Sequence, residues 1–227
     1  MTAPRRVLAE ADCERCREGR WLTQPVNTAS SLAYVAVGAA LVRRADAAGS
    51  PAARTRAHLV ALALAGLSVG SVAYHGPGGP VSHRLHDASI VAAALFLAAG
   101  DVAVARGGPP PGSRHLAGAA AVGLVACGPR TSLAAQEITG AVGAVADGLA
   151  WRAAPPGSRS RRLRGLAAVA WAVGAAAQAT GRTGGPLCRP DSVLQVHGAW
   201  HVISAVALGL TAQAQIEADA EAPGERG

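Results

Sequence analysis

The chain has 227 residues, of which 50% are hydrophobic and 15% are charged, and its mean hydropathy is +0.25. The apolar residues are mostly small, with a single Phe and a single Met, which is typical of closely packed membrane helices rather than of a soluble core. The formal charge of +7 comes from Arg residues in short clusters without interleaved aromatic residues, which argues against nucleic-acid binding.

The N-terminal segment, residues 1–26, has no long apolar run after Arg5 and Arg6, so it is not expected to be a signal peptide. We expect it to lie outside the membrane. Residues 27–213 should form an all-α bundle of seven transmembrane helices, and residues 214–227 a disordered acidic tail.

Seven apolar stretches carry this prediction, and clusters of Gly and Pro separate most of them. The stretches are Asn27–Val42, Ala57–Tyr74, Ala88–Ala105, His115–Cys127, Thr131–Trp151, Gly165–Thr180 and Val193–Ala212. A spanning helix needs about 20 apolar residues, with about 17 as a lower limit, so the fourth stretch is short. The boundary between the fourth and fifth, at Gly128-Pro129, is the least certain division.

The distribution of Arg predicts the orientation in a cell membrane. Eleven Arg residues lie in the first, third and fifth loops and four in the second, fourth and sixth. Because positive loops stay in the cytoplasm, the N-terminus is expected outside and the C-terminus in the cytoplasm. Five Arg residues in the N-terminal segment oppose this orientation.

Polar residues interrupt the apolar stretches at three places. Ser71 and His75 end the second stretch, Asp87 opens the third, and His197 and His201 begin the seventh. Residues four apart face the same side of a helix, so each pair projects together. With seven spans, all three places lie at the outer surface.

This convergence predicts a metal site. A catalytic zinc ion is typically held by three protein ligands, which leaves one position open. A single His near a helix end is more often an interfacial or packed residue, and a lone HxxxH pair is a weak signal. Several ionisable residues at one depth of a membrane are costly, however, and usually functional. A zinc site therefore explains the pattern better than coincidence.

These motifs, together with Pro25-Val-Asn27-Thr-Ala-Ser-Ser31, resemble the alkaline ceramidase family, part of a superfamily of seven-helix membrane hydrolases that includes the adiponectin receptors. The resemblance extends from about Cys13 to the end of the seventh stretch. It implies that His75, His197 and His201 bind zinc. Asp87 would then orient or deprotonate the reacting water, and Ser71 would bind the substrate carbonyl or the oxyanion.

The reaction implied by the resemblance is hydrolysis of the amide bond of an N-acyl lipid such as ceramide. Its products are a fatty acid and a long-chain amine. The partners would be the lipid substrate and the bilayer. The acyl chain, the head group and the oligomeric state are not predicted.

The N-terminal segment departs from the family, which binds calcium there through acidic residues and an Asn. Glu14 matches one acidic position, and Asp12 or Glu10 could substitute at another, but Gln24 replaces a carboxylate. Since calcium prefers several charged oxygen ligands, a calcium ion is not favoured here. Asn27 is instead expected to cap or brace the first helix.

The cysteines are interpreted from the same resemblance, because the family has a disulfide between these two regions. We therefore expect Cys13 to pair with Cys188, with Cys16 as the competing partner. A structural zinc site is not expected, since a single CxxC supplies too few ligands. Cys127, within an apolar stretch, should serve only packing.

Other residues have plainer interpretations. His83 and His86 are expected in a solvated loop, although either could relay protons or contact substrate, and Asp147 is expected to pair with Arg152.

Two other membrane functions remain open. A non-enzymatic receptor or sensor could keep the zinc as a structural ion, and a proton-coupled transporter could use buried His and Asp residues as relays. The receptor would need neither Ser71 nor Asp87, and the sequence has no matching pair of broken helices, which disfavours the transporter. A soluble Ala-rich bundle is a further alternative.

Overall fold

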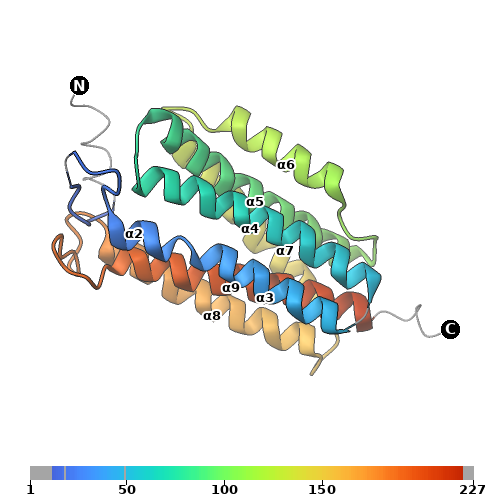
Figure 1. Ribbon diagram of the computed structural model, residues 1–227. Coiled ribbons are helices and arrows are strands. Elements are labelled where there is room, and N and C mark those ends of the chain that lie inside the picture. Colours follow the sequence, from blue (N-terminus) through green and yellow to red (C-terminus); the bar gives the residue numbers. More distant parts are fainter. Residues whose placement is uncertain (1–11, 18, 49, 222–227) are drawn as a thin grey trace.

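The computed structural model describes residues 12–17, 19–48 and 50–221, and all regular secondary structure in this part of the chain is helical (Figure 1). The helices are α2 (Pro25–Ser30), α3 (Ala33–Ala48), α4 (Pro51–His75), α5 (Pro80–Arg106), α6 (Ser113–Ala126), α7 (Ser132–Ala153), α8 (Arg159–Gly181) and α9 (Val196–Glu221). Only two residues separate α2 from α3, and both belong to one apolar rod, Pro25–Ala47. The described part of the chain thus forms seven rods that lie side by side.

Each predicted apolar stretch corresponds to one of these rods. The division between the fourth and fifth is confirmed, because α6 ends at Ala126 and α7 begins at Ser132. The disordered tail is wrong for residues 214–221, which continue α9 as far as Glu221. Gln215 and Ile216 in this extension are buried against other helices, which explains why it stays helical. The remaining tail, residues 222–227, lies outside the described residues.

Proline and serine residues set the helix starts. Pro is found in the first turn of α2, α4 and α5, where its missing N–H leaves no helical hydrogen bond unmade. Ser158 caps α8 by accepting a hydrogen bond from the main-chain N–H of Arg161 at 3.1 Å. These local signals explain why the helices begin just after the Gly- and Pro-rich breaks.

Small residues allow the helices to approach closely. A side chain at Gly123 of α6 would collide with the main chain of α5 at Ala88, and one at Gly174 of α8 would collide with the ring of Trp200 in α9. Close approach of helices at small residues is typical of membrane bundles. Helices α6, α7 and α8 also expose large apolar side chains, for example Val125, Ile138 and Val169.

Three of the rods are long and apolar enough to cross a membrane, within the described residues: Pro25–Ala47, Pro51–His75 and Pro80–Arg106. Helix α6 has only 14 residues and falls below the usual spanning length. These three rods make a membrane protein plausible, whereas the orientation in the membrane stays a prediction.

A network of buried charges holds the bundle together at the end where α9 finishes. Arg164 of α8, fully buried, donates from Nη1 to Asp101 of α5 at 2.6 Å and to Asp147 of α7 at 2.5 Å. Gln215 of α9 donates to the same Asp101 and accepts from Arg56 of α4. Helices α5, α7, α8 and α9 and the start of α4 therefore meet in one polar layer.

This network corrects two sequence expectations. Asp147 pairs with Arg164 rather than with Arg152, because the start of α8 packs beside the end of α7. Arg56 and Arg164 were counted as loop charges for the orientation, but both are buried inside helices. The other Arg residues of this count lie near helix ends or in loops, and they still favour the same orientation.

At the opposite end of the bundle, the N-terminal segment is anchored by a disulfide. Cys13 is bonded to Cys188 in the loop between α8 and α9, which confirms the expected pairing. Cys16 is not in a disulfide, and Cys127 is buried in a small apolar cluster with Ala88 and Val91, as predicted. The disulfide joins positions 175 residues apart, so it closes nearly the whole chain into a loop.

We expect the Cys13→Ser variant to lower the free energy of unfolding by about 2–5 kcal/mol, because the cross-link restricts a very large loop in the unfolded chain. Denaturation in detergent measures the change. Cys16→Ser is the matched control and should leave stability nearly unchanged. Equal stability of the two variants would contradict a stabilising role for the disulfide.

Candidate metal centre

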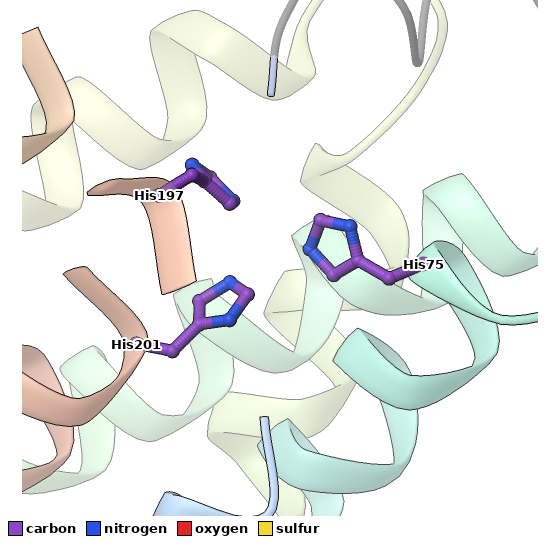
Figure 2. A group of neighbouring side chains, drawn as sticks. All are labelled: His75, His197 and His201. Carbon is purple, nitrogen blue, oxygen red and sulfur yellow. The ribbon is translucent and has the colours of Figure 1, made fainter. Parts of the chain in front are cut away.

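Three buried imidazoles from two helices gather at the end of the bundle that carries the disulfide. His75 is the last residue of α4, while His197 and His201 lie one turn apart at the start of α9. One ring nitrogen from each lies within 4.8 Å of the others, and all three residues are at most 5% exposed. Figure 2 shows the rings directed towards a common space. The His75, His197 and His201 cluster could therefore hold a metal ion.

Hydrogen bonds at Nδ1 fix how His75 is oriented. Its Nδ1 lies 2.7 Å from Oε1 of Gln24, and the amide nitrogen of Gln24 donates to the carbonyl of Glu14 at 2.9 Å. Since the Gln24 nitrogen is engaged there, its oxygen faces the ring and accepts a proton from Nδ1. The Nε2 atom of His75 then carries the lone pair, and it is buried with no hydrogen-bond partner.

The other two rings are held in the same way. His197 Nδ1 lies 2.8 Å from Oε1 of Gln178 in α8, and His201 Nδ1 lies 2.9 Å from Oγ of Ser30. The Ser30 hydroxyl donates to the carbonyl of Asn27, so its oxygen is left to accept from the ring. Each histidine thus keeps Nε2 free as a possible ligand atom.

This arrangement fits a metal ion by its own chemistry. Metal-binding histidines almost always donate their second ring N–H to an oxygen acceptor, which fixes the tautomer and the ring orientation. Neutral imidazole nitrogens suit zinc and several other transition metals. The unpartnered Nε2 of His75 would be a costly buried polar group without such a partner.

Ser71 lies beside the cluster, one helical turn before His75. Its hydroxyl is 2.8 Å from that of Ser31, which itself donates to the carbonyl of Asn27 at 2.7 Å. Because the Ser31 proton is used on that carbonyl, Ser71 donates to Ser31. Ser71 must therefore turn its proton away from Ser31 to bind any other group.

Asp87 is buried at the start of α5, and it contacts two neighbouring histidines. His86 Nδ1 lies 3.1 Å from Oδ1, and His83 Nε2 lies 3.5 Å from Oδ2. The ring of Tyr74 stacks on both of these histidines, and the His86 ring centroid lies 6.0 Å from that of His75.

His83 and His86 are consequently not loop residues, as the sequence had suggested. They belong to the first turns of α5, which begins at Pro80. They connect Asp87 to the edge of the histidine cluster.

The residues considered for calcium are used differently. Both carboxylate oxygens of Glu14 accept main-chain hydrogen bonds, from Val26 at 2.9 Å and Asn27 at 2.8 Å, so Glu14 caps α2. Burial raises the pKa of the Glu14 carboxyl, while these two hydrogen bonds favour its charged form. Asn27 braces the N-terminal segment through a long contact, 3.5 Å, to the carbonyl of Asp12.

Within the described residues, the histidine cluster is the single group of three or more His, Cys, Asp or Glu side chains suited to a metal. Glu10, the other acidic residue considered, lies outside the described residues. The Glu14 oxygens are already engaged by main-chain donors, so the geometry gives no support to a calcium site.

Sequence reasoning missed the residues that orient the histidines. Gln24 was interpreted only as a departure from an acidic pattern, and Gln178 was not considered. Gln178 is an isolated polar residue within the apolar run of α8, and that isolation is the signal that could have identified it.

No protein-family model and no curated protein matches the sequence. The function must therefore be inferred from the geometry of the site.

The Gln178→Ala variant should bind zinc about 10–100-fold more weakly than the wild type, because His197 loses the acceptor that fixes its tautomer. Competition with a chelator measures the affinity. Gln213→Ala is the matched control, since Gln213 is buried in α9 but bonds to Glu217 far along the helix. Equal affinity in both variants would argue against this role of Gln178.

Proposed function

We propose that the chain is an integral membrane hydrolase of the alkaline ceramidase type, with a zinc ion bound by His75, His197 and His201. It cleaves the amide bond of an N-acyl lipid to a fatty acid and a long-chain amine. The observation that carries the proposal is the buried cluster of three imidazoles whose Nδ1 atoms each face an oxygen acceptor, which leaves Nε2 as the ligand atom. The resemblance of the sequence motifs to that family is the second support for the proposal.

The membrane part of the proposal is supported by the surface of the bundle. Three rods meet the length and composition needed to cross a bilayer, and large apolar side chains face outward on α6, α7 and α8. Exposed apolar surface of this extent is unusual for a soluble monomer. We place the N-terminus outside, so that the histidine cluster lies near the outer surface.

A bound zinc ion would polarise the amide carbonyl and promote deprotonation of a water molecule at neutral pH. Ser71 lies one turn from His75 and can donate to the carbonyl oxygen once its proton leaves Ser31. Asp87 can accept the proton of the attacking water and return it to the leaving amine. His86 contacts this carboxylate through Nδ1, its ring centroid lies 6.0 Å from that of His75, and it would keep Asp87 oriented.

The test combines metal analysis with release of fatty acid from a panel of N-acyl lipids in detergent. We expect the wild type to contain zinc and to release fatty acid. Ser71→Ala should keep the zinc and lower turnover about 10²–10³-fold, as loss of an oxyanion donor does. Asp87→Asn should also keep the zinc and lower turnover about 10²–10⁴-fold.

Ser160→Ala is the matched control, because Ser160 is a buried serine that bonds to the carbonyl of Ala214 at the other end of the bundle. It should retain full turnover. A wild type that contains zinc but cleaves none of the lipids would favour the receptor with a structural zinc. A wild type without zinc would overturn both functions.

A further inference from the structure

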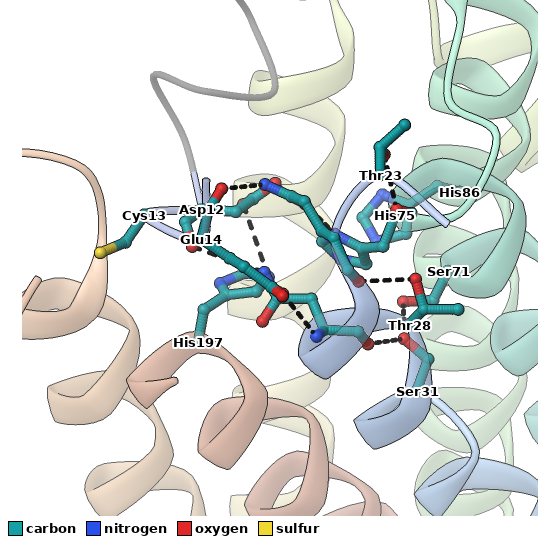
Figure 3. A network of polar contacts seen from close by, with 12 residues as sticks. Asp12, Cys13, Glu14, Thr23, Thr28, Ser31, Ser71, His75, His86 and His197 are labelled. Atoms are coloured by element: carbon teal, nitrogen blue, oxygen red, sulfur yellow. Dashed lines mark hydrogen bonds and ion pairs between the residues drawn. The ribbon is translucent and has the colours of Figure 1, made fainter. Parts of the chain in front are cut away.

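The carboxylate of Asp12 lies beside the histidine cluster, on the side of the N-terminal segment (Figure 3). Its Oδ1 is 3.4 Å from Nε2 of His197, and its Oδ2 is 3.8 Å from Nδ1 of His75. Asp12 is 4% exposed, so both oxygens are largely removed from water. The side chain is therefore placed at the metal site rather than in solvent.

The contacts of Asp12 leave its charge poorly compensated. Its neighbours among the described residues include the rings of His75 and His197, which are neutral in the tautomers assigned above, and the side chain of Tyr74. Its Oδ2 atom has no hydrogen-bond partner, and neither has Nε2 of His75. A buried carboxylate with no cation beside it is unfavourable. A cation bound at the histidine cluster would give Nε2 of His75 a partner and would compensate the charge of Asp12.

The spacing between Asp12 and His197 suits a shared ion. Two ligands at about 2.0–2.1 Å from a tetrahedral zinc ion lie about 3.3 Å from each other. The 3.4 Å between Asp12 Oδ1 and His197 Nε2 agrees with this separation. The histidine atoms, within 4.8 Å of each other, would draw closer around the ion.

A carboxylate ligand would balance part of the charge of the ion, and position distinguishes Asp12 from the other carboxylates of this region. Three neutral imidazoles leave both charges of a divalent cation uncompensated in apolar surroundings. Asp87 is engaged by His83 and His86, and both oxygens of Glu14 accept main-chain hydrogen bonds. Among these carboxylates, Asp12 is the one whose contacts are with two histidines of the cluster, His75 and His197.

The chain around Asp12 is fixed by its neighbours. Cys13 is bonded to Cys188, and its main-chain N–H donates to the hydroxyl of Thr183 at 3.0 Å. Glu14 is tied to the first turn of α2 by two hydrogen bonds. The carboxylate is consequently presented from a constrained segment, although it precedes the first helix.

We propose that Asp12 is a fourth protein ligand of the metal, so that the site consists of three imidazoles and one carboxylate. This inference rests on the metal site of the proposed function and adds a ligand to it. Catalytic zinc sites can expand to five ligands, so a carboxylate at this position remains compatible with hydrolysis.

The first test measures zinc affinity by competition with a chelator. Asp12→Asn keeps the shape of the side chain and removes its charge. We expect the zinc affinity to fall by more than about 100-fold, which exceeds the loss expected when a residue that only hydrogen-bonds a metal ligand is removed. Asp191→Asn is the control on the same side of the protein, where Asp191 is exposed and paired with Arg15. Affinity of the Asp12→Asn variant within threefold of the wild type would overturn the proposal.

The second test separates direct ligation from a long-range effect of charge. The Asp12→Cys variant is prepared in a Cys16→Ser background, and peptide mapping selects protein that keeps the Cys13–Cys188 disulfide. X-ray absorption at the zinc edge should then show one sulfur at about 2.3 Å. A shell of light atoms alone, as in the wild type, would overturn the proposal.

The outcomes distinguish this inference from the proposed function. Zinc in the wild type, with no loss of affinity in Asp12→Asn and no sulfur in Asp12→Cys, would reject the Asp12 ligand and leave the three-histidine site intact. Absence of zinc from the wild type would reject both.

Discussion

The His75→Ala variant is expected to lose its zinc and all measurable hydrolysis of N-acyl lipids. His75 is the single ligand from α4, and its Nε2 is a buried atom without a hydrogen-bond partner. Without it, the two α9 histidines form only an i, i+4 pair, and a catalytic zinc ion is typically held by three protein ligands. Metal analysis and fatty-acid release on the same preparation measure both effects.

His58→Ala is the matched control, because His58 lies on the same helix but is exposed, and its Nδ1 lies 2.8 Å from the carbonyl of Arg54 in the preceding turn. It should retain both zinc and activity. If His75→Ala kept a full equivalent of zinc, the ion would have to bind elsewhere, and the proposed centre would be wrong.

A second large effect is expected at the opposite end of the bundle. Arg164→Ala should lower the free energy of unfolding by about 3–5 kcal/mol, because Asp101 and Asp147 would remain as carboxylates without their buried cation. Denaturation in detergent measures the change. Zinc content per folded molecule should be unchanged, since the network lies far along the bundle from the histidines.

Arg162→Ala serves as the control for this substitution. Arg162 is exposed two residues earlier on the same helix, so its loss should change stability by no more than about 0.5 kcal/mol. An equal effect in both variants would show that the buried charges do not stabilise the bundle.

The helices were largely predictable because apolar runs and Gly- or Pro-rich breaks are local properties of the sequence. Each predicted stretch became one rod, including the short fourth one. The end of α9 was missed, because its polar sequence resembles a disordered tail. Burial of Gln215 against Asp101, which lies far away in the chain, keeps that segment helical.

For the site, the sequence predicted the three histidines but not the residues that orient them. Spacing alone brought His197 and His201 together, and the count of spans placed His75 at the same end. The roles of Gln24, Gln178 and Asp12 depend on how loops and side chains are oriented, which spacing does not encode. The N-terminal segment in particular is positioned by a disulfide to the loop before α9.

The short helix α6 has a consequence for the surrounding lipid. At 14 residues it is about 21 Å long, whereas the hydrocarbon layer of a typical bilayer is about 30 Å thick. In the membrane that we propose, the acyl chains next to α6 must shorten or tilt to avoid exposure to the polar connections at its ends. Hydrophobic mismatch of this kind would favour placement of the protein in thinner regions of the bilayer.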